Sequence, residues 1–307
     1  MKTESIKIAI GFTAICLLWG STWLVIKIGL GPLTPLFSAG FRFTVASVFI
    51  FALMKFRKIS VQTDSVSIKL YIILALFSYV IPFGLVYWAE QFIESGLTSV
   101  LFAVFPFFVI IFSRLAIPGE SVGVYKVLGV TLGFTGILFI FAENLSFDIE
   151  KDFWGSLAVF GSGVMQAAVA VAIKKFGKHL NPLSMNLVPV FAAGIILVGI
   201  SFLFEDSSTW QFNSIAIFSI LYLAIFGTLF TFTTYYWLLK RMNVVILSLS
   251  AFITPIVALV LGWFVLNEKL SFQAMLGSSL VLIGILFANF RGLLNYYKER
   301  FNRNKND

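Results

Sequence analysis

Ten apolar stretches follow one another along the chain, and the short segments between them hold most of the charged residues. A helix needs about 20 consecutive apolar residues to cross a bilayer, and each stretch is close to this length. The pattern therefore predicts ten membrane-spanning helices, over residues 8–28, 36–54, 70–89, 97–117, 122–142, 153–173, 185–204, 215–238, 245–266 and 272–290.

The composition excludes an ordinary water-soluble protein. Of the 307 residues, 59% are hydrophobic and only 12% are charged, whereas about 25% of a typical soluble domain is charged. The 36 phenylalanines suit a lipid-facing surface, and ten spans leave no room for a separate soluble domain. The net charge of +8 would suggest nucleic acid as a partner of a soluble protein. Here the basic residues flank apolar segments, so no nucleic-acid partner is expected.

The single cysteine and the N-terminal segment add no separate function. Cys16 lies within an apolar stretch, so neither a disulfide nor a metal site is expected. The first apolar run follows a short basic segment, as in a signal peptide, but it continues without a small-residue cleavage site. We therefore expect it to remain as the first span.

The basic residues predict the orientation of the chain. They gather in the N-terminal segment, in the even-numbered connections and after residue 290, while Lys27, Lys151 and Lys269 fall in odd-numbered connections. Because positively charged connections stay in the cytoplasm, we expect a multi-pass protein of the cell (inner) membrane with both termini cytoplasmic. The basic tail, residues 291–307, is expected to lie against the anionic inner leaflet.

The two halves of the chain match each other at a nearly constant shift. Lys27 and Pro35 correspond to Lys174 and Pro182, and a Tyr-Trp pair precedes a proline at the same spacing in each half. Because each half holds five spans, the second half enters the membrane with opposite polarity, as in many secondary transporters. The sequence thus predicts an all-α integral membrane protein with ten transmembrane helices in two inverted five-helix repeats, residues 1–147 and 148–290.

Short motifs occur along nearly the whole chain. They are Trp19-Gly20-Ser21-Thr22, Phe41-Arg42-Phe43, the block from Ser95-Gly96-Leu97 to Gly119-Glu120, and Thr254-Pro255-Ile256 followed by Asn267-Glu268. These motifs resemble the drug/metabolite transporter superfamily, EamA type, with one EamA-like unit in each half. The resemblance implies a bundle around a central cavity and a secondary transporter, in most cases an exporter of small metabolites such as amino acids. A nucleoside, sugar or drug as substrate stays open.

Arg42 is the most informative single residue. It lies inside the second span, where an arginine costs at least about 2.5–3.5 kcal/mol, so a polar group is expected to face it. It could bind a substrate carboxylate, form a gating ion pair, or extend to the outer headgroups. Glu90 ends the third span and is the candidate partner and the candidate group for proton coupling, unless it is a solvated residue at a loop end.

Polar and aromatic residues in several spans are the candidates for a substrate-binding cavity. Hydroxyls, an amide and aromatic rings suit a zwitterionic or neutral amphipathic solute, although each could instead bond a neighbouring helix. Pro106 and Pro255, equivalent in the two halves, are the candidate hinges, because proline removes a helix hydrogen bond. The candidate lining residues are Trp19, Ser21, Thr22, Arg42, Tyr87, Glu90, Ser162, Gln166, Thr231 and Tyr235.

Three other classes of protein are less compatible with the sequence. A membrane enzyme needs a nucleophile with a base or a metal-binding cluster, and the only histidine, His179, lies in a connection. A channel-like facilitator would be distinguished from a carrier by flux saturation and countertransport. A structural membrane protein would leave the duplicated prolines unexplained. We therefore expect no enzyme activity, no cofactor and no metal, and the sequence leaves the oligomeric state open.

Overall fold

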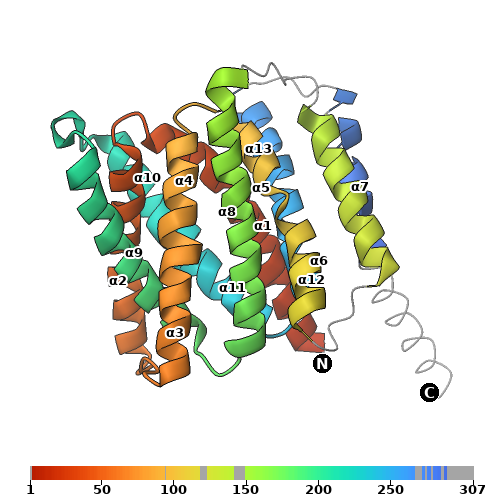
Figure 1. Ribbon diagram of the computed structural model, residues 1–307, viewed down its shortest axis with the longest axis horizontal. Helices are drawn as coiled ribbons and strands as arrows, with labels where there is room; N and C mark the ends of the chain where they lie inside the picture. The colour runs from red at the N-terminus through yellow and green to blue at the C-terminus, as the bar shows by residue number, and fades with distance from the viewer. Residues whose placement is uncertain are drawn as a thin grey trace.

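Helices that run side by side in alternating directions make up the part of the chain that the structure describes (Figure 1). The computed structural model describes residues 2–93, 95–117, 123–141, 149–266, 272–273, 275–277, 279–284 and 287–288. The helices are α1 (Lys2–Gly29), α2 (Pro35–Phe56), α3 (Ser65–Leu74), α4 (Ile81–Ala89), α5 (Ser95–Phe102), α6 (Phe105–Ala116), α7 (Val124–Phe141), α8 (Ile149–Phe176), α9 (Pro182–Phe204), α10 (Ser214–Ala224), α11 (Thr231–Leu239), α12 (Val244–Ser248) and α13 (Ser250–Leu266), together with the 3₁₀ turn η2 (Ser207–Thr209).

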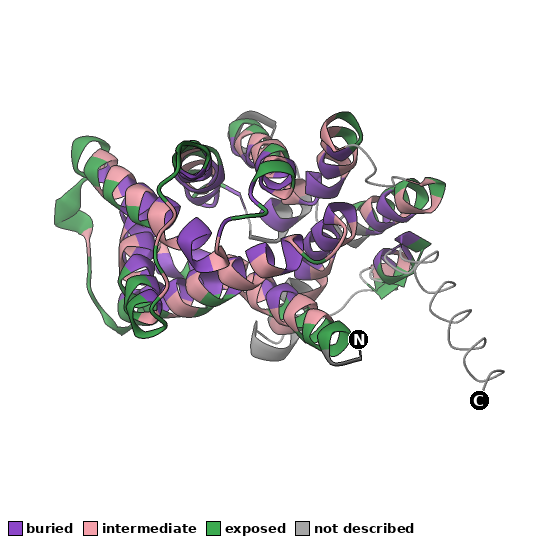
Figure 2. Cartoon of the chain, turned by 90° about the horizontal axis from the view of Figure 1, so that it is seen from below, coloured by how far each residue is buried: buried purple, intermediate pink, exposed green. Residues whose placement is uncertain are grey.

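Several of these helices are long and apolar enough to cross a membrane. Large apolar side chains such as Phe51, Phe202 and Phe218 are exposed, and exposed residues follow the outward faces of the helices (Figure 2). Such a surface suits lipid rather than water, so the chain is a multi-pass membrane protein. In the described residues, six stretches meet the length and hydropathy of a span: Glu4–Gly29, Pro35–Phe56, Ser65–Ala89, Phe153–Phe176, Pro182–Phe204 and Ser214–Leu239.

The remaining expected spans correspond to shorter or incompletely described helices. The fifth is α7, and the tenth, over residues 272–290, is described only in pieces. The total of ten spans and the inverted repeat therefore stay predictions. The boundary at residues 147–148 falls outside the described residues, as do Glu120, Lys269 and the tail at 291–307.

The fourth and ninth expected helices are each divided in two. The fourth is interrupted between α5 and α6, directly before Pro106, which has no N–H to bond the preceding turn. The ninth is interrupted at Leu249, and Pro255 lies within α13. There the hydroxyl of Thr254 donates to Ala251 O at 3.2 Å, the carbonyl that the Pro255 nitrogen cannot serve. Pro106 thus lies beside a break between two helices. Pro255 lies inside a helix, where the Thr254 hydroxyl replaces the missing hydrogen bond.

A π-helical turn lies in the middle of each of two long spans. The turn η1 (Ala75–Val80) joins α3 to α4, and η3 (Ile225–Phe230) joins α10 to α11. After η1 the N–H of Ile81 donates five residues back, to Leu76 O. After η3 the N–H of Thr231 donates to Phe226 O and Thr228 O. Hydropathy alone predicts plain α-helices here, and such turns concentrate at functional sites.

The helices form two groups that face each other. In the first, which we call the α1 group, α1 contacts α10, α11 and α13. In the second, the α8 group, α8 contacts α3, α4 and α6. The short helices α5 and α12 contact members of both groups, and α2 packs along α9 at one side of the bundle (Figure 1).

Glycines allow α2 and α9 to pack closely. A Cβ atom on Gly40 would lie 2.7 Å from Val198 N, and one on Gly194 would lie 2.8 Å from Thr44 N. Both distances are too short for a real Cβ contact unless the backbone moves. Each helix therefore has a glycine at the point where the backbone of the other packs against it. Close approach of backbones through small residues is the usual way in which helices associate in a membrane.

We expect Gly194→Ala to lower the thermal unfolding midpoint of the protein in detergent. Overpacking typically costs about 1–3 kcal/mol, whereas alanine gains only about 1 kcal/mol over glycine in a helix. Gly199→Ala, in the same helix, is the matched control, because a Cβ there would meet nothing within 4 Å. Equal midpoints for the two variants would contradict the close contact between α2 and α9.

Candidate functional site

A cavity lies between the α1 group and the α8 group. About 930 Å³ of space not filled by atoms, open solvent included, lies between its walls. Its walls are mostly apolar and aromatic, with a few polar groups. They include Trp19, Thr22, Trp23, Arg42, Ser78, Phe83, Phe102, Phe105, Ser162, Gln166, Phe232, Tyr235, Tyr236, Ser250 and Thr254.

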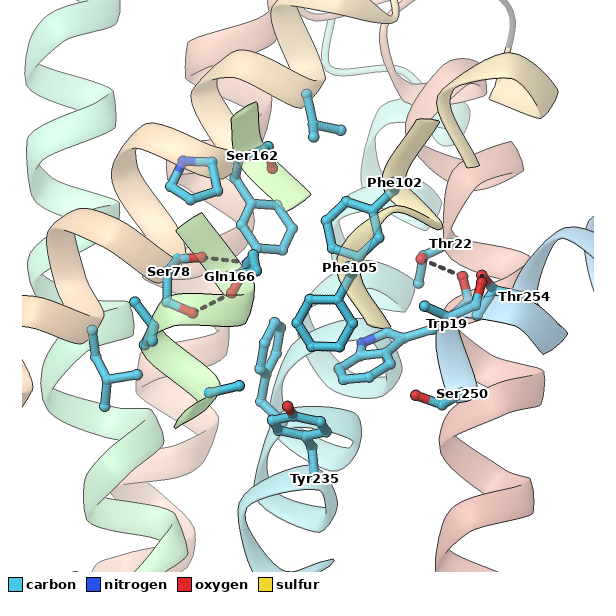
Figure 3. A pocket seen from close by; sticks show the side chains of 18 of the residues that line it. Trp19, Thr22, Ser78, Phe102, Phe105, Ser162, Gln166, Tyr235, Ser250 and Thr254 are labelled. Atoms are coloured by element: carbon cyan, nitrogen blue, oxygen red, sulfur yellow. Dashed lines mark hydrogen bonds between the residues drawn. The ribbon is translucent and has the colours of Figure 1, made fainter. Parts of the chain in front are cut away.

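The wall formed by the α8 group carries an amide held in a fixed orientation (Figure 3). The hydroxyl of Ser78 in η1 donates to Gln166 Oε1 at 2.6 Å. In return, Gln166 Nε2 donates to Ser78 O at 2.9 Å. This reciprocal pair joins η1 to α8 and leaves one amide hydrogen of Gln166 for another acceptor.

The wall formed by the α1 group is aromatic. The ring of Trp19 packs against Phe232 and Tyr235, with ring centroids 5.4 Å and 5.3 Å apart. Figure 3 shows Thr22, Thr254 and Ser250 on the same side of the cavity as Trp19, with Phe102 and Phe105 between the two walls. The rings of Trp19, Phe232 and Tyr235 offer an apolar surface to a solute.

Arg42 contributes the charge of the site. Its side chain is only 1% exposed, and its guanidinium donates to Thr228 Oγ1 at 2.9 Å, to Tyr87 Oη at 3.0 Å and to Gly227 O at 2.9 Å. The ring of Phe83 lies 5.2 Å from its central carbon, a favourable cation–π distance. All of these partners are neutral, so they bind the cation without cancelling its charge.

The π turn η3 provides two of these partners. Because the N–H of Thr231 donates to Phe226 O and Thr228 O, the carbonyl of Gly227 between them is left to accept from Arg42. A side chain at Gly227 would crowd the arginine, since a Cβ there would lie 3.0 Å from Arg42 Nη2. The local backbone of η3 thus creates the arginine site.

Two polar groups of the cavity wall find no hydrogen-bond partner among the described residues. They are the indole N–H of Trp23 and the hydroxyl of Ser162. A buried polar group without a partner costs about 1–3 kcal/mol, so both would gain from a polar solute. Within the described residues neither group has a protein partner, which leaves both available to a polar solute.

The structure brings together six of the ten candidate lining residues. Thr22, Arg42 and Gln166 line the cavity, as do Trp19, Ser162 and Tyr235. The other four are placed elsewhere: the hydroxyl of Ser21 bonds Tyr222 Oη at 2.6 Å, Tyr87 supports Arg42, and Thr231 and Glu90 are buried outside the lining. Their roles as substrate ligands stay untested predictions.

Glu90 is neither solvated nor paired with Arg42. It is fully buried at the end of α4, and neither carboxyl oxygen has a hydrogen-bond partner in the described part of the chain. The expected ion pair with Arg42 is not formed, because the guanidinium is already bonded to Tyr87, Thr228 and Gly227. Glu90 still lies within electrostatic range of both Arg42 and Lys27.

Among the polar or aromatic residues of the wall that sequence reasoning missed are Trp23, Ser78, Tyr236, Ser250 and Thr254. Trp23 could have been found, because it lies one helical turn after Trp19 and so shares its face. Ser78 could not, because its direction depends on the π turn η1, which changes the helical register.

The fold and the cavity define a multi-pass membrane protein with a largely apolar cavity between two helix groups. The model of the EamA-like transporter family matches residues 6–142 and again residues 153–290. The chain is 30% identical over 289 residues to the uncharacterized transporter YoaV of Bacillus subtilis, covering 93% of this chain and 97% of that protein. It is 27% identical over 264 residues to the uncharacterized inner membrane transporter YedA of Escherichia coli, covering 84% and 82%.

A solved crystal structure shares the fold. It has a TM-score of 0.79 at 22% sequence identity, over 93% of this chain and 97% of the other. Because the family model matches nearly the whole chain, the protein belongs to the EamA-like transporter family and is a membrane transporter.

The cavity predicts a pattern of chemical accessibility. With the buried Cys16 replaced by alanine, cysteines at Thr22 and Ser162 should react with a small membrane-permeant thiol reagent, because both residues line the cavity. A cysteine at Ser201, which is fully buried but not part of the lining, is the control and should stay unreactive. Equal labelling at all three positions in mass spectra would contradict the cavity.

Proposed function

We propose that the protein is a secondary transporter that exports small metabolites such as amino acids by alternating access. The α1 group and the α8 group would move relative to each other around the cavity, exposing it first to one side of the membrane and then to the other. The observation that carries this proposal is the buried cation of Arg42, which lines the cavity and donates to three neutral partners.

The charge and chemistry of the wall favour a solute with a carboxylate and an apolar body. Arg42 would attract the carboxylate, and the indole N–H of Trp23 and the hydroxyl of Ser162 would complete its hydrogen bonds. The rings of Trp19 and Tyr235 would cover the apolar part of the solute. An aromatic wall also accommodates an ammonium group, so a zwitterion fits as well.

The inverted repeat and the orientation of the chain belong to the same proposal. The family model matches once in each half, and a π turn lies in the third expected span of each half, which supports a duplicated unit. The distribution of basic residues supports cytoplasmic termini in an inner membrane. Inverted repeats hold their substrate at the interface between repeats.

Proton coupling is proposed to involve Glu90. A buried carboxyl without hydrogen-bond partners is more stable neutral than charged, but the nearby cations of Arg42 and Lys27 favour its charged form. A solute anion bound to Arg42 would weaken the stabilisation that this cation gives to the charged form of Glu90. Binding of the solute and of a proton would therefore be linked.

Transport by purified protein in liposomes tests the proposal directly. Radiolabelled amino acids, nucleosides and sugars are supplied with and without a pH gradient, and both saturation and countertransport are measured. Saturable flux that is accelerated by solute on the opposite side supports a carrier. Flux that never saturates would instead indicate a channel-like facilitator.

Arg42→Ala should reduce the flux of the transported solute at least about tenfold, because one lost charge-assisted interaction is worth roughly 1.5–3 kcal/mol. Arg42→Lys should restore little, since an ammonium lacks the planar fork that reaches Tyr87, Thr228 and Gly227 together. The thermal midpoint of each variant serves as the folding control. Full flux by a folded Arg42→Ala protein would exclude the arginine from substrate binding.

Glu90→Gln should flatten the pH dependence of flux, because glutamine imitates the protonated acid at every pH. Asp206→Asn is the matched control: hydrogen bonds from Ser208 lower the pKa of Asp206, an exposed carboxylate that stays charged throughout the assay. The effects of Glu90→Gln and Arg42→Ala should also be non-additive, as for groups that interact. An unchanged pH profile with additive effects would assign proton coupling to other groups.

A further inference from the structure

Two lysines hold corresponding positions in the two halves of the chain. Lys27 lies near the end of α1 and Lys174 near the end of α8, and each precedes a proline, Pro35 or Pro182, by the same number of residues. Nothing in the proposed substrate site uses either lysine, since neither lines the cavity.

Each ammonium binds the C-terminal end of a helix in the opposite group. Lys27 Nζ donates to Glu90 O and, at 3.1 Å, to Ile93 O, just beyond α4. Lys174 Nζ donates to Leu239 O at 2.7 Å and to Met242 O at 2.6 Å, at the end of α11. Thus Lys27 reaches from the α1 group to the α8 group, and Lys174 reaches from the α8 group to the α1 group.

The two contacts lie at opposite ends of the bundle. The chain rises through α1 to Lys27 and descends through α8 to Lys174, so Lys27 lies at the upper end and Lys174 at the lower end (Figure 1). The cavity lies between these ends, with Ser162 in its upper part and Ser250 in its lower part (Figure 3). Each lysine therefore joins the two groups across one end of the cavity.

The chemistry makes these contacts strong. The last carbonyls of a helix have no partner within the helix and carry its negative partial charge. Separating the two groups at one end would exchange these charge-assisted hydrogen bonds for bonds to water, which is a net loss of stability. A contact of this kind stabilises the conformation that is closed at its end of the cavity.

We propose that Lys27 and Lys174 are positioning residues of the transport step, each stabilising the closed conformation at one end of the cavity. This rests on the alternating access proposed above. The protein would release Lys27 when the upper end opens and Lys174 when the lower end opens. The lower end carries a further contact, because Lys240 Nζ donates to Leu180 O beside the end of α8. The lower contact is thus reinforced.

The test uses single-cysteine reporters in a Cys16→Ala background, with full-length protein in sealed vesicles of both orientations. Ser162→Cys reports the upper part of the cavity and Ser250→Cys the lower part. A membrane-impermeant thiol reagent is added on one side at a time. Lys27→Met should raise the labelling rate of Ser162→Cys from the upper side about fivefold to tenfold, and lower that of Ser250→Cys from the other side. Lys174→Met should do the reverse, and adding Lys240→Met should enlarge its effect.

Matched controls stand beside each lysine. Gln91→Met changes an exposed residue at the end of α4 whose amide bonds only its own helix, at Trp88 O. Lys175→Met removes an exposed lysine whose ammonium packs on the neighbouring ring of Phe176. Neither control should alter labelling. Where Lys27→Met or Lys174→Met does not fold, the glutamine variants replace them, because glutamine keeps a donor but loses the charge.

The outcomes separate this inference from the proposed function. Opposite shifts at the two reporters support it. Folded, transporting lysine variants with unchanged labelling, or with both reporters shifted in the same direction, overturn the role of the lysines and leave the transporter proposal intact. Absence of saturable flux in the protein with all of its native residues, together with reporters whose labelling does not respond to solute, overturns alternating access itself.

Discussion

A buried cation without a carboxylate partner determines how the centre of this protein is built. Removing Arg42 from water and leaving it unpaired would be prohibitive in a membrane. The structure meets this cost with three neutral acceptors and an aromatic ring. Tyr87 belongs to α4, whereas Thr228 and Gly227 belong to η3, so the arginine joins both helix groups. The polar centre of the bundle depends on this one interaction.

The backbone of η3 meets part of that demand. In an ordinary α-helix each interior carbonyl already accepts a hydrogen bond from the backbone four residues on. The π turn leaves Gly227 O available to the arginine, and the hydroxyl of Thr228 compensates by donating to Leu223 O at 2.9 Å. A neighbouring polar network continues from there, since Asn186 Nδ2 donates to Thr228 O at 3.2 Å. Hydrogen bonds from Arg42 and from Asn186 therefore both stabilise the irregular backbone of η3.

Much of the fold could be predicted from the sequence, because lipid exposure imposes a strong hydropathy signal on every span. The position of Arg42 inside a span also identified it as a residue of the centre. Its partners could not be predicted: Gly227 and Thr228 lie far along the chain, and a π turn has no hydropathy signature. Glu90 was the natural candidate by charge alone, yet neutral acceptors already surround the guanidinium. Charge complementarity is thus a weaker guide than backbone geometry in this site.

The arrangement of the charges explains how a solute could influence the whole bundle. A ligand shifts a conformational equilibrium only when it binds the two states with different affinity. A solute anion on Arg42 would compete with Tyr87 on one group and with Thr228 and Gly227 on the other, so it would alter the contact between the groups directly. The lysines at the two ends donate to backbone carbonyls and do not line the cavity. Solute recognition at the centre and closure at the ends would then be separate interactions, coupled through the relative position of the two helix groups.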